Sequence, residues 1–110
     1  MKIDATKEGN AIVMSLKGRL DAAASSEFET SLSEWISKGD NNFLLNFTEL
    51  DYISSAGLRS ILATSKKLKE RNGKIFLAGL RGPVEEVFKV SGFMAIFRVF
   101  ATAEAALREI

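Results

Sequence analysis

The sequence predicts an α/β fold in which a mixed, mostly parallel sheet of four to five strands packs against about four helices. The short and nearly all-apolar segment at 43–47 is typical of a central strand covered on both faces, and the segment 74–80 is predicted to be a further strand. Amphipathic helical segments alternate with the strands, an order that favours a parallel sheet. The chain has 110 residues, the size of one small domain, so we expect residues 1–110 to form a single domain.

The first half of the chain is expected to begin with a hairpin. Gly9-Asn10 tolerates positive φ between two short strands, and the second strand, 11–17, ends at Gly18-Arg19-Leu20-Asp21. In the helix that follows, Ser26 and Glu29 have the spacing of a capping box, and a start one turn earlier is left open. Its apolar stripe consists of Phe28, Leu32, Trp35 and Ile36.

The second half repeats the alternation of strand and helix. Strand 43–47 is followed by a connector at 48–53 and by a helix that begins near Ser54-Ser55-Ala56-Gly57 and stops at Asn72-Gly73. After the strand at 74–80, Gly82-Pro83 opens a third helix, which ends at Ser91-Gly92. The remaining elements are a short strand at 96–100 and a closing helix with Thr102 as its N-cap.

The residue types present exclude several classes of enzyme. The chain contains no histidine and no cysteine, so an imidazole base, a Ser-His-Asp triad, a thiolate nucleophile and the usual zinc ligands are all missing. Lysine and arginine number 15 against 14 aspartates and glutamates, a net charge of +1 that gives no support to direct nucleic-acid binding. We expect no cofactor and no bound metal.

No apolar run is long enough to span a membrane, and the first residues carry charges where a signal peptide would be apolar. We therefore expect the protein to be cytoplasmic.

Ser54-Ser55-Ala56-Gly57 is the most informative candidate site. It lies at the start of a helix, after a strand and a connector, where α/β sheets commonly present ligands and partners. Two interpretations are open. One serine can cap the helix by accepting a backbone N–H, or one hydroxyl can be exposed and accept a phosphate beside the positive end of the helix dipole.

Other candidates carry less weight. A catalytic serine needs a base, and Lys66 and Lys67 lie three turns farther along the helix. The basic run 66–74 is interpreted as a solvated helix end that complements the helix dipole. Asp21, Glu49 and Asp51 are expected near one end of the sheet, but their spacing does not require a cation.

Three separated segments together resemble the STAS domain family, and in particular the bacterial anti-sigma factor antagonists. They are Gly18-Arg19-Leu20-Asp21, the run from Leu44 through Ser54-Ser55-Ala56-Gly57-Leu58 with Ile61-Leu62 behind it, and Ser91-Gly92-Phe93 followed by Ile96-Phe97. The resemblance extends over the whole chain.

The resemblance implies a binding module that acts as a partner switch. Such antagonists bind an anti-sigma factor, which is often itself a serine kinase, and thereby free a sigma factor; phosphorylation ends the binding and a serine phosphatase restores it. Counted back from Gly57, the phospho-acceptor falls on Ser55. The family commonly has aspartate at the preceding position, where this chain has Ser54, which becomes a second candidate acceptor. The family's nearby aspartate falls on Asp21.

We therefore expect no enzymatic activity, and a partner-binding surface at Asp21, Ser54, Ser55, Ala56 and Gly57. The expected partners are an anti-sigma factor or serine kinase and a serine phosphatase, and the chain itself is expected to be a monomer or a weak dimer. One alternative is a stand-alone STAS subunit of another signalling or transporter complex, without phosphorylation. A serine-dependent hydrolase is the second.

Overall fold

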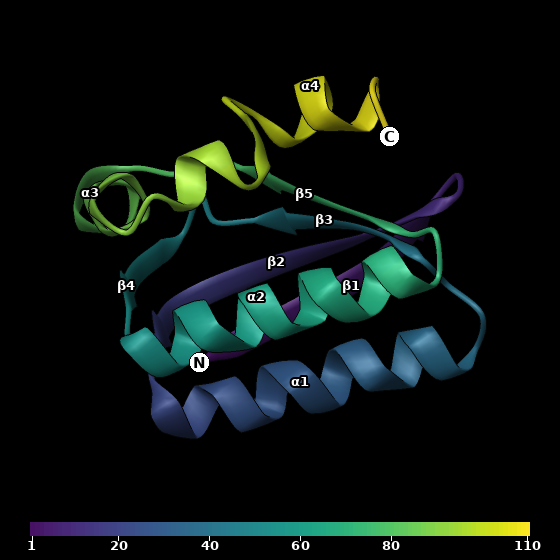
Figure 1. The fold of residues 1–110 in the computed structure, drawn as a ribbon, viewed down its shortest axis with the longest axis horizontal. Coiled ribbons are helices and arrows are strands. Elements are labelled where there is room, and N and C mark those ends of the chain that lie inside the picture. Colours follow the sequence, from purple (N-terminus) through teal and green to yellow (C-terminus); the bar gives the residue numbers. More distant parts are fainter.

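The computed structural model describes residues 1–110 and has one six-stranded sheet with helices on both faces (Figure 1). The strands are β1 (Lys2–Glu8), β2 (Ala11–Leu20), β3 (Asn42–Asn46), β4 (Leu50–Ile53), β5 (Lys74–Ala78) and β6 (Arg98–Phe100). The helices are α1 (Ala22–Ser37), α2 (Ser55–Glu70), α3 (Gly82–Val90), the single 3₁₀ turn η1 (Phe93–Ala95) and α4 (Ala103–Leu107).

The sheet is mixed and mostly parallel, as predicted. Its order is β1-β2-β3-β5-β6, in which only the β1–β2 pair is antiparallel. The β1–β2 turn lies at Gly9-Asn10, with Glu8 paired to Ala11. The predicted fold class is therefore confirmed, although the sheet has one strand more than the sequence predicted.

The additional strand is β4, in a segment that we predicted to be a connector. It pairs in parallel with the end of β2, where β2 extends beyond β3. Leu50 and Ile53 are buried while the two residues between them are exposed, so the segment lacks the alternation that marks a half-buried strand. Its strand conformation depends on pairing with a distant segment.

Several predicted boundaries were wrong for local reasons. β2 continues to Leu20 across an irregularity in its pairing at Gly18, whose φ of 98° suits a residue without a side chain. α1 begins at Ala22 under an Asp21 cap, one turn before Ser26, which is the earlier start that the sequence left open. β5 ends at Ala78, where Gly79 turns the chain at a positive φ of 74°. β6 begins at Arg98, because the preceding residues form the 3₁₀ turn η1.

Two apolar cores lie on the two faces of the sheet. Helices α1 and α2 run side by side below it in Figure 1, and together with α3 they enclose the larger core of 19 buried residues. α4 lies on the opposite face over a smaller core of five buried residues. Burial of apolar surface on both faces accounts for the nearly all-apolar sequences of β3 and β5. The sheet is thereby a rigid support for the loops at its edge.

Candidate functional site

The candidate site lies at the edge of the sheet where β2 and β4 both end. Their last residues, Leu20 and Ile53, are paired in register. Asp21 and Ser54 follow them directly and are the N-caps of α1 and α2. The pairing of the two strand ends therefore brings the beginnings of two helices together. It places Ser54 beside Leu20, which is 34 residues away in the chain.

Ser54 fixes the start of α2. Its hydroxyl accepts a hydrogen bond from the N–H of Gly57 at 3.1 Å and donates one to the carbonyl oxygen of Leu20 at 3.2 Å. Its backbone N–H donates to the same carbonyl at 3.0 Å. Both hydrogen-bonding capacities of this half-buried hydroxyl are in use, so Ser54 has the structural role that one of the two sequence interpretations predicted for a serine here.

Gly57 allows α2 to approach β2 closely. A Cβ atom at this position would lie 2.8 Å from the carbonyl oxygen of Leu20 and 2.9 Å from Cγ1 of Ile53. Both distances are shorter than van der Waals contact, and one of the two atoms belongs to the backbone. The absence of a side chain at Gly57 is therefore required by packing.

Ser55 is the first residue of α2 and is exposed. Its hydroxyl makes no hydrogen bond with the protein, and the first turn of the helix contains no acidic residue. A negative group at this position would lie at the positive end of a 16-residue helix. The structure thus divides the two serines between the two interpretations, since Ser54 caps the helix and Ser55 presents a free hydroxyl.

The other three predicted contact residues lie at the same edge but differ in exposure. Asp21 is half-buried, and its Oδ1 accepts the N–H of Ala24 at 3.0 Å, which engages the carboxylate in capping α1. Ala56 is half-buried and Gly57 is buried. Of the five predicted residues, Ser55 alone is freely exposed.

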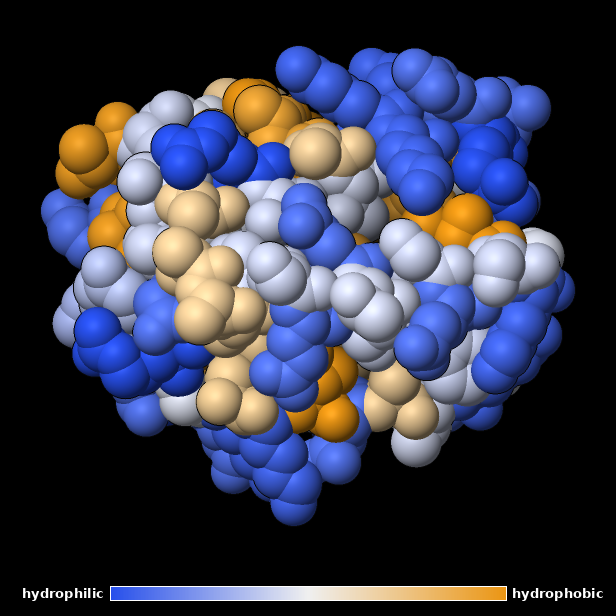
Figure 2. Space-filling view, turned by 90° about the horizontal axis from the view of Figure 1, so that it is seen from below, coloured by the Kyte–Doolittle hydropathy of each residue, from blue (hydrophilic) through white to orange (hydrophobic).

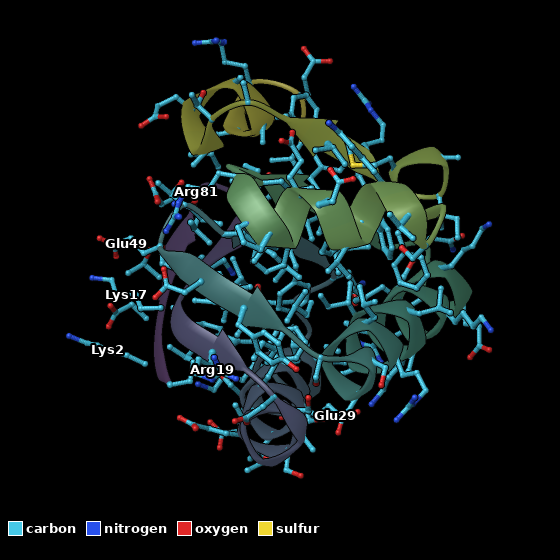
Figure 3. The ribbon with its side chains drawn as sticks, turned by 90° about the vertical axis from the view of Figure 1, so that its left-hand side faces the viewer. Lys2, Lys17, Arg19, Glu29, Glu49 and Arg81 are labelled. Carbon is cyan, nitrogen blue, oxygen red and sulfur yellow. The ribbon has the colours of Figure 1, made fainter.

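Arg19 and Tyr52 also belong to this edge, which the sequence did not predict. The two are paired across β2 and β4, and the guanidinium of Arg19 lies 4.1 Å from the centre of the Tyr52 ring. Tyr52 is one of three large apolar side chains that are exposed. Figure 3 shows Arg19 close to the beginning of α1. Because the sequence predicts a connector at 48–53, no pattern in it places these two residues opposite each other.

A polar cleft of about 680 Å³ lies farther along the same edge, toward α4. It is lined in part by Lys17, Glu49 and Arg81, which lie along one side in Figure 3. Lys17 and Glu49 form an ion pair at 3.0 Å, and the hydrogen bond with Glu49 raises the pKa of Lys17 above its ordinary value of 10.5. Arg81 bonds the carbonyl oxygen of Thr48 and pairs with Asp51 at 3.3 Å, so it fastens the β5–α3 loop to the segment around β4.

The carboxylates expected at this edge do not gather into one cluster. Asp21 caps a helix, while Glu49 and Asp51 pair with different cations. No group of three or more histidine, cysteine, aspartate or glutamate side chains is placed to hold a metal ion.

A family model for the STAS domain matches residues 2–106. This chain belongs to the STAS domain family. The Bordetella bronchiseptica protein BtrV, named as a proposed anti-sigma factor antagonist, is 38% identical over 106 residues, covering 96% of this chain and 91% of BtrV. The resemblance to the anti-sigma factor antagonists of the family is thereby confirmed.

Solved structures confirm the STAS fold. A crystal structure of a Thermotoga maritima protein, also a proposed anti-sigma factor antagonist, superposes with a TM-score of 0.92 at 19% identity, covering 98% of this chain and 93% of that one. The phosphorylated form of the Bacillus cell-fate determinant SpoIIAA has a TM-score of 0.79 at 24% identity and covers 98% of both chains. None of the helices in this STAS domain combines the length and hydropathy needed to cross a membrane.

Proposed function

We propose that this STAS domain is a cytoplasmic anti-sigma factor antagonist that binds an anti-sigma factor with serine kinase activity and releases it when Ser55 is phosphorylated. The exposed and unbonded hydroxyl of Ser55 at the start of α2 is the observation that carries the proposal. The sequence identity of 38% with BtrV, over 96% of this chain, supports the antagonist role. The phosphorylated form of SpoIIAA supports the switch.

The local chemistry suits a residue that is modified by a partner. A kinase brings ATP, metal and base, so the acceptor needs only an accessible hydroxyl on a rigid support. Ser55 fits this need because its neighbour Ser54 holds the helix start in place and leaves the Ser55 hydroxyl free. In this scheme the domain has no catalytic activity of its own, and a serine phosphatase removes the phosphate.

A phosphate on Ser55 would change the charge of the surface without changing the fold. It adds about −1.5 to −2 charges at neutral pH, next to backbone N–H groups that the helix itself leaves free. A partner that docks over Ser55 must then desolvate this charge or move away from it, and both weaken binding.

The test uses recombinant anti-sigma factor kinases encoded in the same genome, with labelled ATP and mapping of the phosphate by mass spectrometry. We expect wild type and Ser54→Ala to take up phosphate, and Ser55→Ala to bind the kinase without being labelled. Phosphorylation of wild type is expected to dissociate its complex with the kinase. The Ser54→Ala variant controls for the neighbouring hydroxyl.

Equal labelling of Ser55→Ala and wild type would refute the assignment of the acceptor. Stable binding of an anti-sigma factor that never transfers phosphate to this chain would favour the alternative function, a stand-alone STAS subunit that works without phosphorylation. Labelling of Ser55 by a serine-reactive phosphonate would favour the hydrolase, although no histidine exists in the chain and neither lysine nor carboxylate bonds to the Ser55 hydroxyl.

A further inference from the structure

Ser55 is the first member of a straight row of side chains along the exposed face of α2. The row, which we call the α2 stripe, is spaced by four, three, four and three residues and consists of Ser55, Arg59, Leu62, Lys66 and Lys69. Residues at this spacing lie on one face of a helix. Four of the five are exposed, and Leu62 is half-buried against the larger core.

The three cations of the α2 stripe have no acidic partner within the protein. Five ion pairs occur in the structure, and none involves Arg59, Lys66 or Lys69. Their side chains also make no hydrogen bond, whereas Arg71 at the C-cap is held by Asn41. Figure 2, which views the molecule from the side of α1 and α2, shows hydrophilic surface at the upper right, on the side where both helices end. The positive charge is therefore available to a partner.

The neighbouring helix limits where a partner can contact this charge. Glu27, Glu29 and Glu34 are exposed on α1, and Glu29 is the one of them that lines the groove toward α2. A shallow groove between the two helices is lined by residues that include Glu29 and Lys67, so Lys67 faces α1. The α2 stripe is turned away from that groove, because its members lie about a quarter turn or more around the helix from Lys67. The α2 stripe is consequently a basic row whose acidic neighbours are Glu29 across the groove and Glu70 at the end of α2.

We propose that the anti-sigma factor presents an acidic surface, which docks along the α2 stripe from Ser55 to Lys69. This inference rests on the proposed function, and it adds the chemistry of the partner and the line of contact. Opposite charges accelerate encounter and fix orientation, and Leu62 supplies an apolar contact in the middle of the row. A nucleic acid fits less well, because a net charge of +1 gives little general attraction for a phosphate backbone and Glu29 of α1 lines the groove beside α2.

The same geometry explains why phosphate on Ser55 would release such a partner. Arg59 lies one helical turn from Ser55, about 6 Å along the axis, within the reach of a phosphate. Phosphorylation therefore neutralises the first cation of the stripe and places a negative charge against an acidic surface. Lys69 lies about 21 Å from Ser55 along the helix axis, beyond the Debye length of about 8 Å at physiological salt. Salt ions therefore screen the interaction between the phosphate and Lys69, and the charge of Lys69 stays available to the partner. The switch thus acts on one end of the docking row.

The experiment measures the Kd between the full chain and the recombinant anti-sigma factor by calorimetry, at about 0.05 M to about 0.5 M NaCl. The test variant is Lys66→Glu with Lys69→Glu, and the matched control is Lys2→Glu with Arg108→Glu. The control makes the same change of net charge at two exposed residues of β1 and of the segment after α4, away from the α2 stripe. Circular dichroism establishes that both variants stay folded, which we expect because all four positions are exposed.

We expect wild-type binding to weaken as salt rises, and the stripe variant to bind roughly tenfold or more weakly with a reduced salt dependence. The control is expected to bind within about threefold of wild type. Equal binding by wild type and the stripe variant would overturn the acidic-surface proposal while leaving the proposed function intact. Wild type that binds no anti-sigma factor would overturn both. If binding of a DNA duplex depends on Lys66 and Lys69 while binding of the anti-sigma factor does not, the partner of the α2 stripe is a nucleic acid and the acidic-surface proposal is overturned.

Discussion

Ser54 donates two hydrogen bonds to the carbonyl oxygen of Leu20, from its backbone N–H at 3.0 Å and from its hydroxyl at 3.2 Å. The same hydroxyl accepts the N–H of Gly57 at 3.1 Å. One short side chain therefore joins the end of β2 to the first turn of α2. The position of Ser55 depends on this junction, because Ser55 itself makes no side-chain bond.

The two serines are therefore expected to differ in their contribution to stability. Ser54→Ala removes a helix cap and a bond to a strand carbonyl, and we expect a loss of about 1–2 kcal/mol in the free energy of unfolding. Ser55→Ala removes an exposed hydroxyl without a partner, and we expect a change within about 0.5 kcal/mol. Urea unfolding followed by the fluorescence of Trp35, the only tryptophan, measures both.

Each serine variant is the control for the other, since the two changes delete the same atom from adjacent residues. Similar losses for both would show that the hydroxyl of Ser54 does not hold the helix start. A loss confined to Ser55→Ala would reverse the roles given to the two serines.

The division between these serines shows how far the sequence alone could lead. The sequence indicated that a helix begins near Ser54 and that one serine could cap it, because capping depends on residues a few positions apart. It could not decide which serine does so. That choice depends on the carbonyl of Leu20, which lies 34 residues away in the chain and becomes a neighbour only when β4 pairs with β2.

Gly57→Ala is expected to destabilise the protein, although alanine is the better helix former. In an unconstrained helix this substitution stabilises by about 0.5–1 kcal/mol. Here the new Cβ would lie 2.8 Å from the carbonyl oxygen of Leu20, so α2 must move away from β2. We expect a net loss of about 1–3 kcal/mol. Urea unfolding measures the sign of the change in the free energy of unfolding. A stabilised variant would show that α2 can shift away from β2 without loss of stability.

Arg19 and Tyr52 are expected to be energetically coupled. The guanidinium lies 4.1 Å from the ring centre at an exposed site, where such a contact contributes about 0.5–1 kcal/mol. A double-mutant cycle with Arg19→Ala and Tyr52→Leu measures the coupling as the non-additive part of the change in unfolding free energy. Tyr52→Phe is the control, because it keeps the ring and is expected to retain the coupling. Additive single changes would show that the contact contributes nothing.

These two residues also show which part of the site was hidden in the sequence. Strand β3 was evident from its run of buried apolar residues, whereas β4 has two exposed residues between two buried ones. Such a short segment becomes a strand only because β2 extends past β3 and offers a free edge. The exposed pair of Arg19 and Tyr52 follows from that register. Local sequence could therefore predict the helix starts of the site but not the strand that flanks them.

The pKa of Lys17 provides a test of the polar cleft. The hydrogen bond with Glu49 and the charge of Glu49 raise this pKa above 10.5, and the more distant Asp4 adds a smaller increase. Because the folded-state pKa is raised, the stability that the pair contributes is fully present below pH 10.5 and is lost as the pH rises through the folded-state pKa. The pair is therefore expected to give no pH dependence of stability around neutral pH.

The measurement is an NMR titration of the Lys17 side chain in wild type and in two variants. In wild type the midpoint is expected above 10.5. Glu49→Gln removes the ion pair, which makes the largest contribution to the raised pKa of Lys17. The midpoint is therefore expected to fall toward 10.5, because the desolvation that lowers this pKa remains. Asp4→Asn removes the weaker influence and is expected to lower the midpoint less. A wild-type midpoint at or below 10.5, or a larger decrease for Asp4→Asn than for Glu49→Gln, would mean that Lys17 and Glu49 do not pair in solution.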